Sequence, residues 1–313
     1  MRLAVVLSMR MWGIDLYEKD VTPMKRLIVS VILLMLIGTF LLAYKGKSTE
    51  EHTGFTTHRV ISHAMGAVDG LAYTNAREAF VENYKKGSRV FEVDLMFTSD
   101  GQLVARHEWT ESFTEQMQQE HAVATEQGGK PWSYHQFKNT PIHGSYTPVD
   151  WKDVLDLLET YPDAYIVTDT KEQDPAQIKQ LFAQLTRQAQ EKNPELLSRI
   201  VPQIYNEEML RTLRSIYPYP SIIYTLYATE DKDDQIIRFV QQNDITAVTL
   251  PENRVSGALV ESLRQAGAVC YVNTINELKD AAEYEQMGVR GFYTDILTEK
   301  ELTERSWLYA LRP

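Results

Sequence analysis

The chain has 313 residues, of which 43% are hydrophobic, so it can bury the core of one large domain or two small ones and is not a disordered protein. A formal net charge of -11 argues against nonspecific binding to a polyanion, and we expect no nucleic-acid partner. A single cysteine excludes an internal disulfide framework and a multi-cysteine metal site. The composition does not indicate any protein partner.

The first informative segment along the chain is apolar. Residues 26–44 carry no charge after Arg26 and are about long enough to span the hydrocarbon core of a membrane. No small-residue cleavage pattern closes the segment, so we predict an uncleaved transmembrane anchor and not a signal peptide. Basic residues before it favour a cytoplasmic location for residues 1–25. The sequence thus predicts a single-pass protein of the cell membrane with the bulk of the chain outside the cytoplasm. Met24 is an alternative start.

Residues 45–57 are polar and suit a linker to a domain at 58–313. In this domain short β-branched or apolar runs alternate with longer stretches of helical period. The strands are expected at 60–63, 90–95, 165–170, 200–204, 221–226, 246–250, 269–273 and 291–295. The helices are expected at 75–87, 151–162, 177–192, 207–218, 235–244, 257–268 and 277–288. The strict alternation predicts a parallel (β/α)₈ barrel of the TIM type, with a doubly wound open sheet as the alternative.

Two segments after the second expected strand do not follow this alternation. The run QLVARH at 102–107 follows the turn TSDG, whose Asp-Gly pair favours a tight hairpin. We therefore expect an antiparallel arm folded back at the top of the barrel and not a ninth barrel strand. The irregular region 110–150 is too long for an ordinary connection. Because it contains Trp132, Tyr134 and Phe137, we interpret it as a lid or specificity loop.

Histidines and acids fall where a barrel carries its chemistry, at the carboxyl ends of the strands. His63 ends the first strand, Glu92 and Asp94 lie toward the end of the second, and His107 ends the arm. Alternate residues of a strand share a face, so Glu92 and Asp94 point the same way. Two carboxylates turned into one barrel mouth need a cation, because like charges that close cannot both ionise without one. This pattern predicts a divalent metal with oxygen ligands.

Further along, Asp169 and Lys171 end the third strand on a common face, and Asp295 ends the last. We expect Asp295 to cap the helix after its strand, and we leave it out of the ligand set. The segments that carry these residues are SHAMG, YTNAREAF, FEVDL, TSDGQLVARHE, IVTDTK and GVRGFYTDI. Together they resemble the glycerophosphodiester phosphodiesterase family, within the wider phospholipase C-like phosphodiesterase superfamily. The resemblance runs from about Val60 to about Leu297.

The resemblance implies a (β/α)₈ barrel that holds one divalent cation, Ca²⁺ or Mg²⁺. It implies that His63 and His107 are the general acid and base. It also implies three metal ligands, namely Glu92, Asp94 and Asp169. Lys171 stands where the family has a substrate-binding lysine.

Departures from the family pattern concern the phosphate environment. The family usually has an arginine directly after the first histidine, where this chain has Ala64, and we expect Arg106 or Lys171 to substitute for it. Asn75 lies where the family shows a Glu-Asn-Thr element and is a candidate substrate contact, with an N-cap of the following helix as the alternative. The pair His58-Arg59 spells the family's His-Arg motif too early. We reject it because His58 precedes the first strand and would lie at the bottom face of the barrel.

The sequence therefore predicts metal-dependent hydrolysis of a phosphodiester, either a glycerophosphodiester or a glycerophosphate-bearing envelope molecule, by a catalytic domain outside the cytoplasm. One histidine takes a proton from the attacking water or substrate hydroxyl, and the other protonates the leaving oxygen. We assign the base to His63. One alternative is a phospholipase that acts on intact lipid head groups. Another is an inactive barrel that binds an envelope polyanion, although binding alone does not need a paired acid and base.

Overall fold

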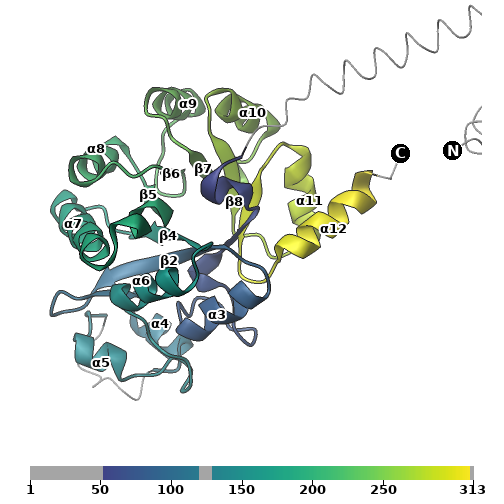
Figure 1. The fold of residues 1–313 in the computed structure, drawn as a ribbon. Coiled ribbons are helices and arrows are strands. Elements are labelled where there is room, and N and C mark those ends of the chain that lie inside the picture. The colour runs from purple at the N-terminus through teal and green to yellow at the C-terminus, as the bar shows by residue number, and fades with distance from the viewer. Residues whose placement is uncertain (1–51, 120–128, 311–313) are drawn as a thin grey trace, which may run out of the picture. The chain divides into compact units, whose positions relative to one another are not determined.

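The strands form one sheet that closes on itself (Figure 1). The computed structural model describes residues 52–119 and 129–310. The sheet order is β1-β9-β8-β7-β6-β5-β4-β2-β3, and β1 also pairs with β2, which closes the barrel. The parallel strands are β1 (Val60–Ser62), β2 (Val90–Phe97), β4 (Tyr165–Asp169), β5 (Ile200–Ile204), β6 (Ile223–Thr225), β7 (Ala247–Pro251), β8 (Val269–Asn273) and β9 (Gly291–Thr294). The predicted TIM-type barrel is confirmed, and closure excludes the doubly wound open sheet.

A helix follows each parallel strand, and these helices surround the barrel (Figure 1). They are α3 (Arg77–Lys85), α6 (Trp151–Thr160), α7 (Pro175–Lys192), α8 (Glu207–Ile216), α9 (Asp233–Gln242), α10 (Gly257–Gln265), α11 (Leu278–Gln286) and α12 (Glu299–Ala310). Polar caps define where several begin; the Asn206 side chain, for example, accepts a hydrogen bond from the Met209 N–H at the start of α8. The helix α12 was not among the expected helices.

The barrel interior is filled by one apolar or aromatic side chain from each parallel strand. These residues are Ile61, Val90, Val167, Val201, Ile223, Ala247, Tyr271 and Tyr293. Phe55 packs against the same cluster and stacks on Tyr271 with ring centroids 6.1 Å apart. Phe55 lies in the short 3₁₀ helix Gly54–Thr57, which the sequence analysis assigned to a linker. Burial of this aromatic ring packs the 3₁₀ helix against the barrel.

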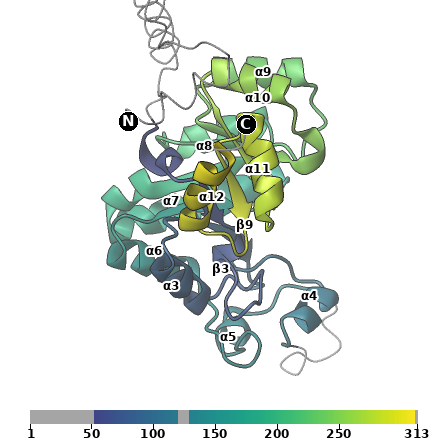
Figure 2. The ribbon, with the colours of Figure 1, turned by 90° about the vertical axis from the view of Figure 1, so that its right-hand side faces the viewer.

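The predicted antiparallel arm is confirmed as β3 (Leu103–Ala105), which pairs with the end of β2. The region 110–150 is not wholly irregular, since it contains α4 (Glu111–Gln116) and α5 (Tyr134–Lys138) at one end of the barrel (Figure 2). Trp132 and Phe137 pack with Trp109 and Val104 in a separate buried cluster. The region 110–150 is an insertion between β3 and α6. Trp132 and Phe137 stabilise this insertion from within, so they do not form an exposed specificity surface.

The localisation prediction is corrected. Within residues 52–119 and 129–310, no helix combines the length and the apolarity that crossing a membrane requires. The long helix α7, for instance, buries Ile178, Leu181 and Leu185 along one side and presents polar residues on the other. A single-pass membrane protein with an extracytoplasmic catalytic domain is therefore not supported. The predicted anchor at 26–44 and the segment 1–25 lie outside the described residues.

Candidate active site

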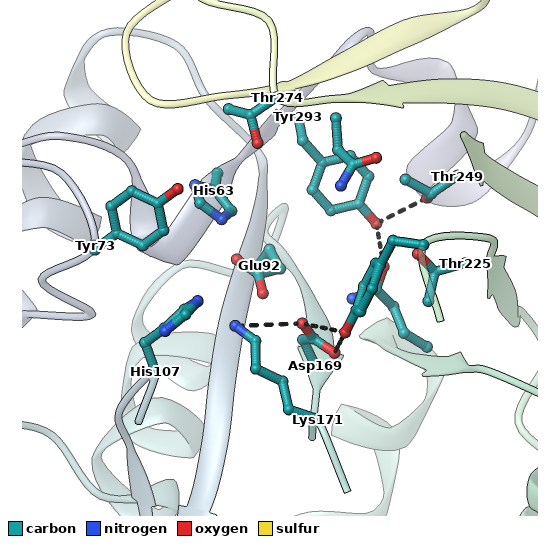
Figure 3. Close-up of a pocket in the computed structure, with 13 residues that line it drawn as sticks. His63, Tyr73, Glu92, His107, Asp169, Lys171, Thr225, Thr249, Thr274 and Tyr293 are labelled. Atoms are coloured by element: carbon teal, nitrogen blue, oxygen red, sulfur yellow. Dashed lines mark hydrogen bonds and ion pairs between the residues drawn. The ribbon is translucent and has the colours of Figure 1, made fainter. Parts of the chain in front are cut away.

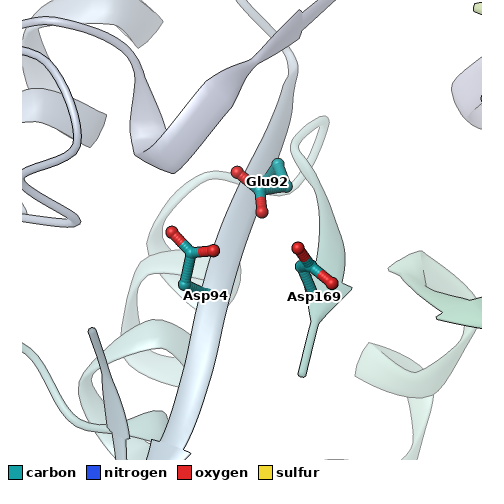
Figure 4. Close-up of side chains that lie close together, drawn as sticks. All are labelled: Glu92, Asp94 and Asp169. Carbon is teal, nitrogen blue, oxygen red and sulfur yellow. The ribbon is translucent and has the colours of Figure 1, made fainter. Parts of the chain in front are cut away.

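Three carboxylates meet at the carboxyl end of two adjacent barrel strands (Figure 4). Glu92 and Asp94 share one face of β2, and Asp94 lies directly beside Asp169 of β4 in the parallel register. One oxygen from each of the three lies within 4.8 Å of the others. All three side chains are buried. Buried carboxylate oxygens that converge in this way suit a hard divalent cation such as Ca²⁺ or Mg²⁺.

The electrostatics of the three carboxylates agree with a cation site. Burial, together with the charge of Asp94, raises the pKa of Glu92 to about 8. Burial likewise raises the pKa of Asp169. Burial also acts to raise the pKa of Asp94, but Lys171 and the two nearby histidines outweigh it and hold that pKa below its ordinary value. A single lysine leaves this cluster short of positive charge, so the donor set fits a divalent cation.

Hydrogen bonds hold each carboxylate in place. The Ala64 N–H donates to Glu92 Oε2 at 2.6 Å. Asn75 clamps Asp94, since its Nδ2 donates to Asp94 Oδ2 at 2.8 Å and its Oδ1 accepts from the Asp94 N–H at 3.1 Å. Asn75 is fully buried, and the N-cap of α3 is Ala76. The N-cap interpretation of Asn75 is therefore corrected: its side chain supports Asp94, one of the three carboxylates that could hold a cation.

Two tyrosines from neighbouring strands support the third carboxylate. The Tyr205 hydroxyl donates to Asp169 Oδ1, and the Tyr227 hydroxyl lies 3.3 Å from both oxygens of Asp169. The Tyr205 hydroxyl also accepts a hydrogen bond from the Lys171 N–H at 2.7 Å. The Lys171 Nζ lies 2.5 Å from Asp94 Oδ1 and 3.7 Å from Asp169 Oδ2. Lys171 thus spans the two aspartates, as expected from its position on the same face as Asp169.

His63 follows β1 and is held by a carboxylate that the sequence analysis set aside. Its Nδ1 lies 2.9 Å from Asp295 Oδ1, and Asn276 Nδ2 donates to the other oxygen of Asp295 at 2.7 Å. Burial alone would lower the pKa of His63, but the hydrogen bond to Asp295 and the charges of Glu92 and Asp94 raise it to about 9. The expectation that Asp295 serves as a helix cap is corrected. Alternate residues of a strand share a face, and Tyr293 points into the barrel. The sequence position of Asp295, two residues later, could therefore have indicated that its side chain also faces the site.

His107 follows the antiparallel arm and has a different environment. Its ring stacks on Phe113, with centroids 5.5 Å apart and an interplanar angle of 26°. Its buried Nδ1 has no hydrogen-bond partner among the described residues, and the Glu108 carboxylate is 3.8 Å away. Burial lowers the pKa of His107, and the charge of Lys171 lowers it further. The two histidines therefore have pKa values that are shifted in opposite directions.

Both imidazoles, Glu92, Asp169 and Lys171 line one cavity of about 220 Å³ (Figure 3). Asp94 joins the group through its ion pair with Lys171. The other lining residues are neutral: Tyr73, Gln203, Thr225, Tyr227, Thr249, Asn273, Thr274 and Tyr293. The titratable acids, histidines and lysine of the cavity thus come from the ends of β1 to β4, and the rest of its lining is rich in hydroxyl and amide groups.

Arg106 does not line this cavity, which corrects its expected role in phosphate binding. It is buried in the insertion, where its guanidinium donates to the Glu108 carbonyl at 2.7 Å, Gln119 Oε1 at 2.8 Å and Thr114 Oγ1 at 3.0 Å. The guanidinium also lies over the rings of Trp109, Phe113 and Trp132. Neighbouring residues of an extended segment point to opposite sides, so Arg106 faces the insertion because His107 faces the cavity.

The model of the Glycerophosphoryl diester phosphodiesterase family matches residues 58–298. A solved glycerophosphodiester phosphodiesterase from Parabacteroides distasonis is 16% identical, with a TM-score of 0.63 over 80% of this chain and 98% of that one. A phosphodiesterase from Oleispira antarctica, solved with the product sn-glycerol-3-phosphate, is 15% identical, with a TM-score of 0.63 over 80% and 97%. A glycerophosphodiester phosphodiesterase from Thermotoga maritima is 17% identical, with a TM-score of 0.52 over 82% and 100%. No curated protein sequence matches significantly. These structures share the barrel fold.

Proposed function

Because this chain belongs to the glycerophosphoryl diester phosphodiesterase family, we propose that its cavity hydrolyses a glycerophosphodiester with one divalent cation and two histidines. Membership of this family identifies the chain as a phosphoric diester hydrolase. The proposed roles of the cation and the histidines rest on one observation. Three buried carboxylates and two imidazoles lie together at one cavity. Glycerol 3-phosphate, the product held by the phosphodiesterase from Oleispira antarctica, is the product that we expect here.

Glu92, Asp94 and Asp169 are the proposed ligands of the cation. Their carboxylate oxygens suit both Ca²⁺ and Mg²⁺, and the choice between the two is left to experiment. A bound divalent cation stabilises the negative charge that builds on the phosphoryl oxygens as a fifth oxygen approaches phosphorus. Lys171, a part of the same cavity wall, adds a second positive charge beside the phosphate.

The opposite pKa shifts of the two histidines favour opposite roles. With its pKa near 9, His63 is protonated at neutral pH and can donate a proton to the leaving alcohol oxygen. His107, with its lowered pKa, is neutral and can take a proton from the attacking water. This assignment reverses the one made from the sequence, which gave the base to His63. The hydrogen bond that His63 Nδ1 donates to Asp295 does not involve the proposed metal ligands, so its share of the raised pKa of His63 persists when the cation is bound.

In this reaction the bond between phosphorus and the alcohol oxygen breaks, and a bond between phosphorus and the water oxygen forms. His107 gains the proton of the water, and His63 loses its proton to the alcohol. Exchange of protons with the solvent restores both imidazoles. The two histidines suit this transfer because the acid, His63, begins protonated and the base, His107, begins neutral.

The proposed function is tested by turnover of purified protein that has been treated with a chelator. We expect release of glycerol 3-phosphate from glycerophosphocholine or glycerophosphoethanolamine after Ca²⁺ or Mg²⁺ is added, and none with the chelator alone. Intact phosphatidylcholine in mixed micelles tests the phospholipase alternative. Faster hydrolysis of the lipid than of the soluble diesters would favour that alternative. No turnover of any diester with either cation would refute the proposal.

The acid and base roles are tested by replacing each histidine. His63→Ala and His107→Ala should each lower kcat by roughly 100-fold or more, because each removes one proton-transfer group. Binding of Ca²⁺ or Mg²⁺, measured by calorimetry, should remain, because neither histidine belongs to the proposed ligand set. His135→Ala is the matched control, since His135 is an exposed histidine of α5 outside the cavity. Wild-type turnover in either cavity variant would contradict the assignment.

A further inference from the structure

Tyr73 lies between β1 and α3 and lines the cavity next to both imidazoles (Figure 3). Its ring stands edge to face against His63, with centroids 4.7 Å apart and an interplanar angle of 86°. It stands in the same way against His107, with centroids 5.3 Å apart and an angle of 89°. Such contacts give aromatic rings a preferred relative orientation. A single tyrosine ring therefore contacts both the proposed acid and the proposed base.

The loop that carries Tyr73 is held in an uncommon backbone conformation. Tyr73 has φ +64° and Asn75 has φ +48°, in the left-handed region that residues other than glycine rarely adopt. The Asn75 N–H donates to the Ala64 carbonyl at 3.2 Å, while the Asn75 side chain is clamped to Asp94. Conformations of this kind persist when the surrounding structure over-determines them. The contacts that support Asp94 therefore also hold Tyr73 beside the histidines.

The cavity offers few donors to a phosphodiester. Lys171 is the only lysine or arginine among the described residues that line it, and its Nζ is already 2.5 Å from Asp94 Oδ1. Arg106 is turned into the insertion. The Tyr73 hydroxyl, by contrast, makes no hydrogen bond to any residue in the described parts of the chain and is turned toward the His63 side of the cavity (Figure 3). Burial raises the pKa of Tyr73, so its hydroxyl keeps its proton at neutral pH.

We propose that Tyr73 is a substrate-binding residue: its hydroxyl donates a hydrogen bond to a nonbridging oxygen of the phosphodiester, while its ring sets the placement of the two imidazoles. The inference rests on the proposed function and adds a residue that the sequence analysis did not include. Charge on the nonbridging oxygens grows as the water attacks, and a hydrogen bond to a charged acceptor is stronger than one to a neutral acceptor. The contact therefore stabilises the transition state more than the bound substrate.

Two substitutions separate the hydroxyl from the ring. Tyr73→Phe should lower kcat/KM for glycerophosphocholine by roughly 10- to 100-fold, as expected for loss of one hydrogen bond to a charged group. The variant should also bind inorganic phosphate more weakly in the Ca²⁺-loaded protein, as measured by calorimetry. The dependence of kcat/KM on pH should keep the position that it has in the wild type. Tyr73→Leu should cause the same losses and in addition move the pH profile, because the imidazoles lose the ring between them.

Tyr284→Phe is the matched control, because Tyr284 lies on α11, outside the cavity, and the variant removes only a hydroxyl that donates to Glu252. It should keep wild-type kcat/KM. Wild-type phosphate affinity in Tyr73→Phe would overturn the proposed contact, even if turnover falls. An unmoved pH profile in Tyr73→Leu would overturn the role of the ring. If the wild type binds phosphate in a Tyr73-dependent way and hydrolyses no diester, the contact stands and the proposed function fails.

Discussion

Asp295→Asn removes the negative charge next to His63 and keeps a side chain of the same shape that can still accept a hydrogen bond from Nδ1. His63 and Asp295 are largely buried, with side-chain exposures of 13% and 11%, so solvent screens the pair only weakly. The rise of the His63 pKa from 6.5 to about 9 corresponds to roughly 3 kcal/mol. A hydrogen bond between charged groups contributes about 1.5–3 kcal/mol, or about 1–2 pKa units. We therefore expect the variant to lose about 1–2 units.

The direct assay is an NMR titration of the imidazoles in the metal-free protein, wild type against Asp295→Asn. The His63 pKa should fall toward 6.5, whereas that of His107, which does not contact Asp295, should stay in place. In the cation-loaded enzyme the alkaline limb of the kcat/KM profile should move to lower pH, because His63 acts in its protonated form. An unchanged His63 pKa, or an alkaline limb that stays in place, would refute the assignment of Asp295 as the partner of the general acid.

The same pair links stability to pH. Because the His63 pKa is raised in the folded protein, its contribution to stability is fully present below about pH 6.5 and is lost as the pH rises through about 9. Asp295 has a lowered pKa, because its hydrogen bond to His63 outweighs the effect of burial, so it stays ionised across this window. Urea unfolding of the metal-free proteins should thus show the wild type about 1.5–3 kcal/mol more stable than Asp295→Asn at pH 6, and a smaller difference above pH 9.

Three further predictions concern the metal site and the insertion. Ca²⁺ or Mg²⁺ at about 100 times its Kd should stabilise the fold by about 2.7 kcal/mol, and an unchanged Tm in calorimetry with both cations would contradict a metal site. In Asn75→Gly the glycine tolerates the positive φ, but both hydrogen bonds to Asp94 are lost. Cation affinity should weaken, and the free energy of unfolding should fall by about 1–3 kcal/mol. Cation affinity equal to that of the wild type would show that these hydrogen bonds are dispensable. Arg106→Met should lower kcat by about 10- to 100-fold through displacement of the adjacent His107 and leave cation affinity unchanged, and wild-type kcat would separate the insertion from catalysis.

Local patterns in the chain were enough for the barrel and for part of the site. Strand and helix periods depend on neighbouring residues, and their regular alternation leaves a closed parallel barrel as the main solution. Within one strand, the period of two predicts that Glu92 and Asp94 share a face. The hairpin turn at Ser99, Asp100 and Gly101 likewise predicts the arm that brings His107 back to the barrel mouth. These features are local, so they can be read without knowing the rest of the fold.

The roles of Arg106, Asn75, Asp295 and Tyr73 depended on the tertiary structure. Arg106 and His107 are neighbours in sequence, yet they face different environments because the insertion supplies Gln119, Thr114 and three aromatic rings on one side only. Asp295 and His63 are far apart in the chain and meet because β9 pairs with β1. Closure of the barrel brings these two side chains together. The residue pattern within either strand does not predict this contact.

The same reason explains Asn75 and Tyr73. Each occupies a left-handed backbone position in a loop, and side-chain direction there follows from contacts with other segments and not from a helical or strand period. The chain's local patterns thus specified which elements form and which acids share a face. Long-range packing decided which partner each site residue has, because the free energy of a buried charge or hydrogen bond depends on groups that only the closed barrel brings within reach.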